Sequence, residues 1–284
     1  MSTPGWGFAF SRRWLGYLAL VVVFAVACAS LAFWQLARRE EARQEIERVE
    51  ANWDSSPVPI GEALPSLDSF DADDKWLPVE MTGTYLTDDQ ILVRGRPYNG
   101  SAGFEVLVPL LLEDGRVFIV DRGWLPAGNQ QDEPDSVPEP PAGEVTVVAR
   151  LKAGEPTVAG RSAPEGQIAT IHLPDIAERL GTDTYTGAYG LLASEDPAPD
   201  VRPQAATRPV ADEGPHLSYA FQWFVFGIMA FVALGWAIRQ EFRARNEDDP
   251  AEQERAERRR LKAARKGLSD AEEEDALLDR ELTP

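Results

Sequence analysis

Two long apolar runs constrain this chain more than any other feature. The first covers residues 14–36 and the second covers residues 217–238, and neither contains an acid or a base. About 20 apolar residues in a helix are enough to cross the hydrocarbon core of a bilayer, which is roughly 30 Å thick. The sequence therefore predicts a membrane protein in which two transmembrane helices bracket a single large domain.

The first run has three alternative interpretations. It could be a cleaved secretory signal or a lipoprotein signal ending at Cys28, and Arg12 and Arg13 could form a twin-arginine address. However, the run continues past Cys28 to Leu36 and carries Trp34 near its end, where tryptophan favours the membrane interface. We therefore expect a retained transmembrane helix.

Flanking charge predicts the orientation. Arg12 and Arg13 precede the first run, and three arginines between 239 and 245 follow the second, which places both termini on the cytoplasmic side of the cell membrane. Arginines at 38, 39 and 43 oppose this assignment, but they alternate with glutamates and precede a long segment. The predicted segments are a cytoplasmic N-terminus (1–13), transmembrane helix 1 (14–36), an extracytoplasmic β-rich domain (37–215), transmembrane helix 2 (217–238) and a charged cytoplasmic tail (239–284), partly helical or disordered.

Alternating and β-branched segments predict a mostly antiparallel β (α+β) domain. Asp114-Gly115 joins two apolar segments and is typical of a hairpin turn. The first helix is expected to continue to about Val49, because opposite charges recur there three or four residues apart. Residues 52–74 read as a loop and residues 195–215 as an extended tether. Strands are predicted at 79–85, 90–94, 104–112, 116–124, 144–151 and 184–192, with a short helix at 175–180.

Composition excludes several classes of function. The net charge is −19, with roughly 33 acidic against 15 basic residues between positions 37 and 215, which argues against a nucleic-acid partner. One cysteine, Cys28, and two histidines, His172 and His216, make a clustered metal site implausible. The common catalytic and nucleotide-binding motifs are absent from the sequence, so we do not expect an enzyme.

His216 stands at the entry to the second apolar run. His216, Tyr219 and Trp223 fall on one helical stripe. They could form a site, or they could be an interfacial cap, since Trp and Tyr favour the membrane boundary. The other histidine, His172, lies in apolar surroundings ahead of the short helix and is expected to be structural.

Arg122-Gly123-Trp124 at the end of a predicted strand is also open to two interpretations. An arginine, a flexible glycine and a large aromatic could form a docking edge for a partner. Alternatively, Trp124 is a core aromatic and Gly123 allows a β-bulge.

Four segments together resemble the surfeit locus protein family, in the order and topology of that family. The resemblance extends over about residues 10–240. Asp121 departs from the asparagine usual in the family, and the charged tail after Arg245 is an addition. The four segments are residues 33–39 (FWQLARR), 103–110 (GFEVLVPL), 120–126 (VDRGWLP) and 216–223 (HLSYAFQW).

The resemblance implies an assembly factor for haem-copper cytochrome c oxidase, assisting delivery of haem a to the catalytic subunit or its insertion there. It implies that haem a is the cofactor, bound stably or transiently, and that His216 is its metal ligand. Tyr219 and Trp223 could flank the macrocycle, and Arg38 and Arg39 could pair with its propionates. The expected partners are the oxidase catalytic subunit, haem a synthase and membrane lipid.

A second class of function stays open from the residues alone. An extracytoplasmic sensor or binding domain could signal to the charged cytoplasmic tail, with His216 as an ordinary interfacial residue.

Overall fold

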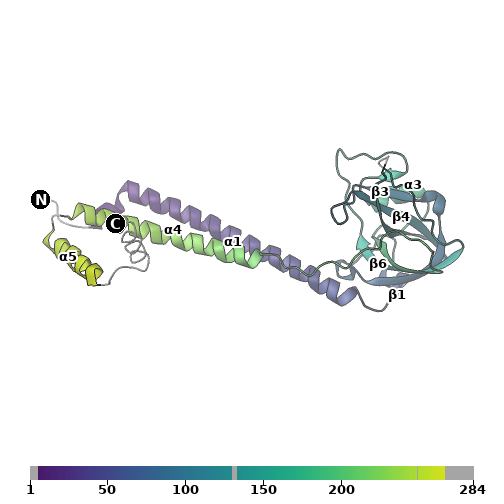
Figure 1. The fold of residues 1–284 in the computed structure, drawn as a ribbon, viewed down its shortest axis with the longest axis horizontal. Coiled ribbons are helices and arrows are strands. Elements are labelled where there is room, and N and C mark those ends of the chain that lie inside the picture. Colours follow the sequence, from purple (N-terminus) through teal and green to yellow (C-terminus); the bar gives the residue numbers. More distant parts are fainter. Residues whose placement is uncertain (1–5, 130–132, 248, 266–284) are drawn as a thin grey trace, which may run out of the picture. The chain divides into compact units, whose positions relative to one another are not determined.

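The computed structural model describes residues 6–129, 133–247 and 249–265. The chain forms two compact units, one made of residues 1–39 and 214–284 and the other of residues 40–213. The helix α1 (Arg12–Asn52) belongs to both, because its first part lies in the helical unit and its last part in the β-rich unit (Figure 1).

The helical unit is an antiparallel pair made of the first part of α1 and of α4 (His216–Arg245). At one end, Arg13 Nη2 lies 2.7 Å from Glu241 Oε1. At the other end, His216 Nδ1 lies 2.8 Å from Gln35 Oε1. The short helix η1 (Trp6–Phe10) precedes the pair, and α5 (Pro250–Arg265) follows it.

Small residues form the contact between the two helices. Cys28 and Ala32 of α1 and Ala220 of α4 are almost completely buried. A Cβ atom built on Gly227 would lie 3.6 Å from Cβ of Cys28. The two backbones can therefore approach closely, as small residues permit in paired membrane helices.

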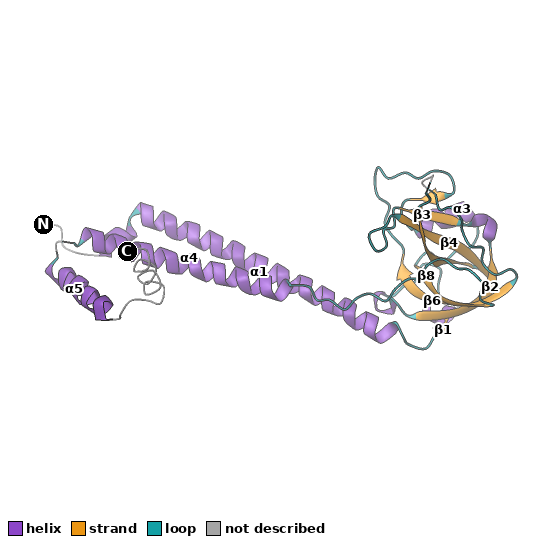
Figure 2. Cartoon of the chain, in the orientation of Figure 1, coloured by secondary structure: helices purple, strands orange, loops and turns teal. Residues whose placement is uncertain are grey.

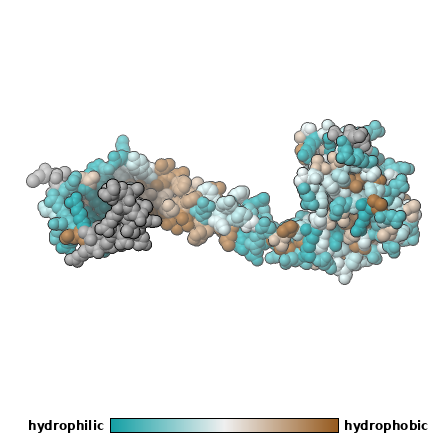
Figure 3. Space-filling model, in the orientation of Figure 1, coloured by the Kyte–Doolittle hydropathy of each residue, from teal (hydrophilic) through white to brown (hydrophobic). Residues whose placement is uncertain are grey.

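Both helices are long and apolar enough to cross a membrane, judged by length and composition. The predicted runs 14–36 and 217–238 lie inside them. Large apolar side chains such as Phe24, Val26 and Phe221 are exposed, and hydrophobic residues, drawn brown, gather along this unit in Figure 3.

The β-rich unit holds one mixed sheet of eight strands among the described residues (Figure 2). The elements are β1 (Val58–Pro59), α2 (Ile60–Ala63), η2 (Ala72–Asp74), β2 (Pro78–Tyr85), η3 (Thr87–Asp89), β3 (Ile91–Arg94), β4 (Gly103–Leu112), β5 (Val117–Pro126), β6 (Glu144–Ala153), β7 (Gln167–Ile168), α3 (Leu173–Leu180) and β8 (Ala188–Asp196). Strands β2, β6, β8, β5 and β4 are neighbours in that order, and β2 also pairs with β4, so these five close into a barrel-like ring.

Two apolar clusters lie on the two faces of this sheet. Alternation along a strand sends successive side chains to opposite faces. On β5, Phe118 and Val120 therefore join the cluster inside the ring, whereas Val117 and Ile119 join a second cluster outside it. The outer cluster includes Leu173 and Ile176 of α3, Val49 near the end of α1, and Trp53, which directly follows α1.

Most predicted elements are confirmed. The hairpin at Asp114-Gly115 joins β4 to β5, and α1 continues well beyond the apolar run. The helix α3 begins with Pro174 in its first turn and ends at Gly181, whose φ of 69° is left-handed. Such a glycine is a common helix terminator because it has no Cβ to clash.

The predicted domain is mostly antiparallel, as expected, and the sheet also has parallel pairs, β5 with β8 among them. Three other sequence predictions need correction. The last strand begins at Ala188 rather than at Thr184, which forms only an isolated bridge with Val117. The loop 52–74 contains β1, α2 and η2. The predicted tether packs on the domain, because Gln204 pairs with Trp124. In the tail, α5 is helical, and residues 266–284 lie outside the described residues.

Candidate functional site

His216 is the first residue of α4 and is half-buried against α1. Its Nδ1 lies 2.8 Å from Oε1 of Gln35, an amide oxygen that can only accept a hydrogen bond. The two atoms form a hydrogen bond when Nδ1 carries the proton, because the N–H group then donates to the Gln35 oxygen. That tautomer leaves the lone pair of Nε2 available, which is the arrangement of a metal-binding histidine oriented by a second residue.

The other residues predicted beside His216 lie on the same two helices. Tyr219 lies one turn along α4 and is exposed, and Trp223 lies one turn further and is half-buried. The ring centroids of Trp223 and Phe226 are 5.9 Å apart. The helical spacing thus places both aromatic residues on the side of α4 that carries His216.

Arg38 and Arg39 follow Gln35 by three and four residues in α1. Residues at this spacing lie on one side of a helix, within one turn. The guanidinium groups therefore emerge from the same end of the helical pair as His216.

Gly214 leaves room on the Nε2 edge of the imidazole. Its φ is +68°, and a Cβ at this position would lie 3.3 Å from both Cδ2 and Nε2 of His216. Any other residue would crowd this edge of the ring. One imidazole whose Nδ1 lies within hydrogen-bond distance of a side chain, bordered by apolar and aromatic residues, fits an axial ligand of haem.

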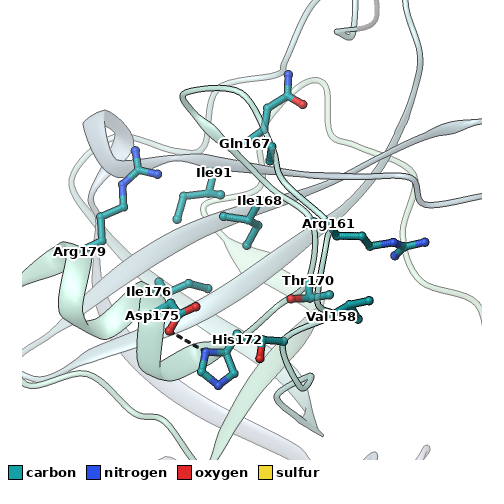
Figure 4. A pocket seen from close by; sticks show the side chains of 13 residues that line it. Ile91, Val158, Arg161, Gln167, Ile168, Thr170, His172, Asp175, Ile176 and Arg179 are labelled. Atoms are coloured by element: carbon teal, nitrogen blue, oxygen red, sulfur yellow. Dashed lines mark ion pairs between the residues drawn. The ribbon is translucent and has the colours of Figure 1, made fainter.

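His172 lies in the β-rich unit, beside a cavity of about 260 Å³ (Figure 4). Its Nδ1 is 2.8 Å from Oδ1 of Asp175 in the first turn of α3, a contact that is an ion pair only when the imidazole is protonated. The structural role expected for His172 stays a prediction. Within residues 6–129, 133–247 and 249–265, no three or more His, Cys, Asp and Glu side chains gather as a metal site.

Arg122 does not form part of a docking edge, contrary to one of the two interpretations of Arg122-Gly123-Trp124. Its side chain is completely buried, with Nη2 3.0 Å from Glu195 Oε1 and Nη1 donating to the carbonyl of Pro138 at 2.8 Å. The hydroxyl of Tyr85 donates to Glu195 Oε2 at 2.9 Å. Burial and the Glu195 carboxylate raise the pKa of Tyr85, so the phenol stays protonated and keeps donating.

Gly123 fits the bulge interpretation, whereas Trp124 is not the core aromatic residue that this interpretation expected. The register between β4 and β5 shifts between Glu105 and Leu107, opposite this segment. Gly123 has a φ of +127°, and a Cβ there would lie 2.4 Å from the carbonyl oxygen of Gln204. Trp124 is half-buried and donates from Nε1 to the carbonyl of Arg96 at 2.7 Å. Of the three residues, only Trp124 presents a side chain at a surface cavity.

Sequence reasoning missed Gln35 as a site residue. Gln35 is 181 positions from His216, so no local pattern joins them. The available signal was its polarity near the end of an uncharged helix, because a polar side chain in such a segment usually meets a partner on a neighbouring helix.

Comparison with known proteins identifies relatives of this chain. The model of the SURF1 family matches residues 22–228. An uncharacterized SURF1-like protein of Mycobacterium tuberculosis (strain ATCC 25618 / H37Rv) is 34% identical over 250 residues, which are 86% of this chain and 90% of the relative. A SURF1-like protein of Monosiga brevicollis is 26% identical over 84% of this chain and 93% of its own length.

A third relative has a more informative name. The "Cytochrome oxidase assembly protein SHY1" of Saccharomyces cerevisiae is 27% identical over 124 residues, or 42% of this chain and 30% of its own length. The family match spans most of the chain. It includes Cys28 and Gly227, which lie against each other in the helical pair. This chain therefore belongs to the SURF1 family.

Proposed function

We propose that this protein is an assembly factor for haem-copper cytochrome c oxidase that holds haem a at His216 and assists its delivery to the catalytic subunit. Family membership and the name of the yeast relative support the role in oxidase assembly. The role is that of a carrier, which needs a binding site and no catalytic groups. The partners are then the oxidase catalytic subunit, the haem a synthase that supplies the cofactor, and membrane lipid.

The contact between His216 and Gln35 carries the haem part of this proposal. Gln35 orients the imidazole and holds the proton on Nδ1, so that Nε2 presents its lone pair. When bound, haem a supplies the iron that this lone pair ligates. Tyr219 and Trp223 offer aromatic surface to the macrocycle, and Arg38 and Arg39 offer guanidinium groups that can pair with propionates in a bidentate way.

The membrane placement follows from the apolar surfaces of α1 and α4. Both helices span the cell membrane in this proposal, with the β-rich unit outside and both termini in the cytoplasm. His216 and Gln35 then lie at the outer interface, where a lipophilic haem can be passed between membrane proteins without crossing water.

The test measures haem on the purified protein. His216→Ala and Gln35→Leu are purified in detergent from cells that make haem a, and Soret absorbance per polypeptide is compared with the wild type. His216→Ala should lose most of the band, and Gln35→Leu should lower haem affinity about 10-fold, as loss of an orienting partner does at metal sites.

His172→Ala is the matched control, because it removes the other histidine. It should keep its haem, with oxidase maturation in cells unchanged. Full haem occupancy in His216→Ala would contradict the assignment of the ligand, and loss in His172→Ala alone would move the site into the β-rich unit.

A further inference from the structure

A second cavity, separate from His216, lies in the β-rich unit beside the bulge of β5. Its volume is about 300 Å³, at the lower end of the range for small-molecule sites. Strands β4, β5 and β6 contribute Glu105, Asp121 and Lys152 to its lining, and Arg96 comes from the segment after β3. The segment that follows β8, beginning with Gln204, forms another wall.

Asp121 is the unusual member of this lining. It follows four buried apolar residues of β5 and is only 3% exposed. Its Oδ1 accepts a hydrogen bond from the backbone N–H of Gly123 at 2.9 Å. Burial and the nearby Glu105 carboxylate raise the pKa of Asp121 to about 8.

The fixed charges around Asp121 do not balance. Arg96 pairs with two acids, since Nη1 and Nη2 donate to Glu155 at 2.9 and 2.6 Å and Nε lies 3.0 Å from Glu105 Oε2. The ammonium of Lys152 lies 5.7 Å from the ring centroid of Tyr189, the phenol that faces the same group of charges. Three carboxyl groups, those of Asp121, Glu105 and Glu155, thus share the two bases Arg96 and Lys152, so the group carries one excess negative charge when all three are ionised.

Aromatic side chains also line this cavity. The rings of Tyr98 and Trp124 lie 5.3 Å apart, and Trp124 is fixed by its bond to the Arg96 carbonyl. Trp76 has a φ of +73°, a left-handed conformation that is costly for a large residue. Its Nε1 donates to Glu45 at 2.9 Å, which helps to hold the ring in place. Backbone strain of this kind gathers at binding sites, and aromatic faces attract cations.

We propose that this cavity binds one monovalent organic cation, an ammonium or guanidinium group, which pairs with the Asp121 carboxylate between the aromatic walls. The cation is carried either by a free small amine or by a basic side chain of a polypeptide. On binding, it replaces the proton of Asp121, so uptake of the cation releases one proton. This site is independent of the haem site and of the role in oxidase assembly.

The test uses n-butylguanidinium as the probe and n-butanol as its uncharged counterpart. Calorimetric titration of the full chain in detergent at pH 9 should show binding of the guanidinium and none of the alcohol. Below pH 8 the affinity should fall about 10-fold per pH unit, because one proton competes with the cation. A short peptide with one internal arginine, titrated in parallel, distinguishes a polypeptide source from a free amine.

Asp121→Asn keeps the size and the hydrogen-bond acceptor of the side chain while removing its charge. This variant should bind the guanidinium at least 10-fold more weakly and without pH dependence, whereas Asp88→Asn, at an exposed turn, should bind as the wild type does. Binding of the peptide alone supports the proposal with a polypeptide source. Equal affinity for n-butanol, equal affinity of Asp121→Asn, or no binding of either cationic probe at pH 9 would each overturn it.

Discussion

Arg122 and Glu195 form an ion pair inside the β-barrel, where neither side chain reaches water. The hydrogen bonds to Tyr85 and to the Pro138 carbonyl satisfy much of what water would otherwise supply. Such a pair is sensitive to loss of one partner, because the remaining charge is then buried alone.

Glu195→Leu should therefore lower the free energy of unfolding by about 3–5 kcal/mol, since Arg122 keeps its charge without a counter-ion. Denaturant unfolding of the full chain, followed by tryptophan fluorescence, measures the effect. Asp54→Ala removes an exposed pair with Arg208 and should cost no more than about 1 kcal/mol. Equal losses in the two variants would contradict the importance of burial.

Asp121 should make stability depend on pH. The pKa of Asp121 is about 8 in the folded chain and about 3.9 in an unfolded one, so between these values the folded state holds a proton that the unfolded state lacks. Stability contributed by this group therefore falls as pH rises from 4 to 8.

Asp121→Asn should remove that slope and be the more stable protein at pH 8. Unfolding free energies of both proteins at pH 5, 6.5 and 8 provide the measurement. Parallel pH profiles for the two proteins would show that Asp121 is ionised in the folded state.

At the scale of elements, the close contact of α1 and α4 at Cys28 and Gly227 can be trapped chemically. The Cβ of a residue at 227 would lie 3.6 Å from Cβ of Cys28, inside the range of disulfides. Gly227→Cys should thus form a disulfide with the native cysteine under mild oxidation in membranes. Counting thiols with a maleimide reagent should give none after oxidation and two after reduction.

Gly235→Cys is the matched control, because nothing lies within 4 Å of a Cβ at that position. It should keep two reactive thiols under the same oxidation. Protection in the control, or free thiols in Gly227→Cys, would contradict the register of the helical pair.

Elements encoded by local patterns were predictable. Alternation predicted β2, apolar segments predicted β4 and β6, and the Asp114-Gly115 turn predicted the hairpin between β4 and β5, because neighbouring residues determine each of these patterns. The two-residue strands β1 and β7 are too short to show a period. The parallel pairing of β5 with β8 joins segments about 70 residues apart and has no signature in either segment.

The candidate sites divide in the same way. His216 could be proposed as a site residue from the sequence because it stands beside a long apolar run. Its partner Gln35 and the cavity around Asp121 could not, because folding brings their members together from distant elements. Arg122 was considered for an exposed docking edge because it lies near the end of a strand in the sequence. In the structure, the ring of strands encloses its side chain.

At the scale of the whole molecule, the proposed membrane topology can be tested by labelling. In a Cys28→Ser background, single cysteines replace Asn129 in the β-rich unit and Glu254 in α5. An impermeant maleimide should label position 129 in intact cells and position 254 only after lysis, because the arginines flanking the apolar runs favour the cytoplasm. Labelling of both from outside would contradict the cytoplasmic position of the C-terminus.

The small residues Cys28, Ala32, Ala220 and Gly227 lie in the contact of the helical pair. Within the part of the chain that the structure describes, much of the exposed apolar surface of the pair carries bulky groups such as Phe24, Phe221, Ile228 and Trp236. In a bilayer, acyl chains pack against such bulky side chains about as well as another helix does. A protein neighbour is favoured over lipid mainly where two backbones can approach closely. Contacts that this anchor makes with other membrane proteins should then exchange readily with lipid, so the anchor can join a partner and leave it again.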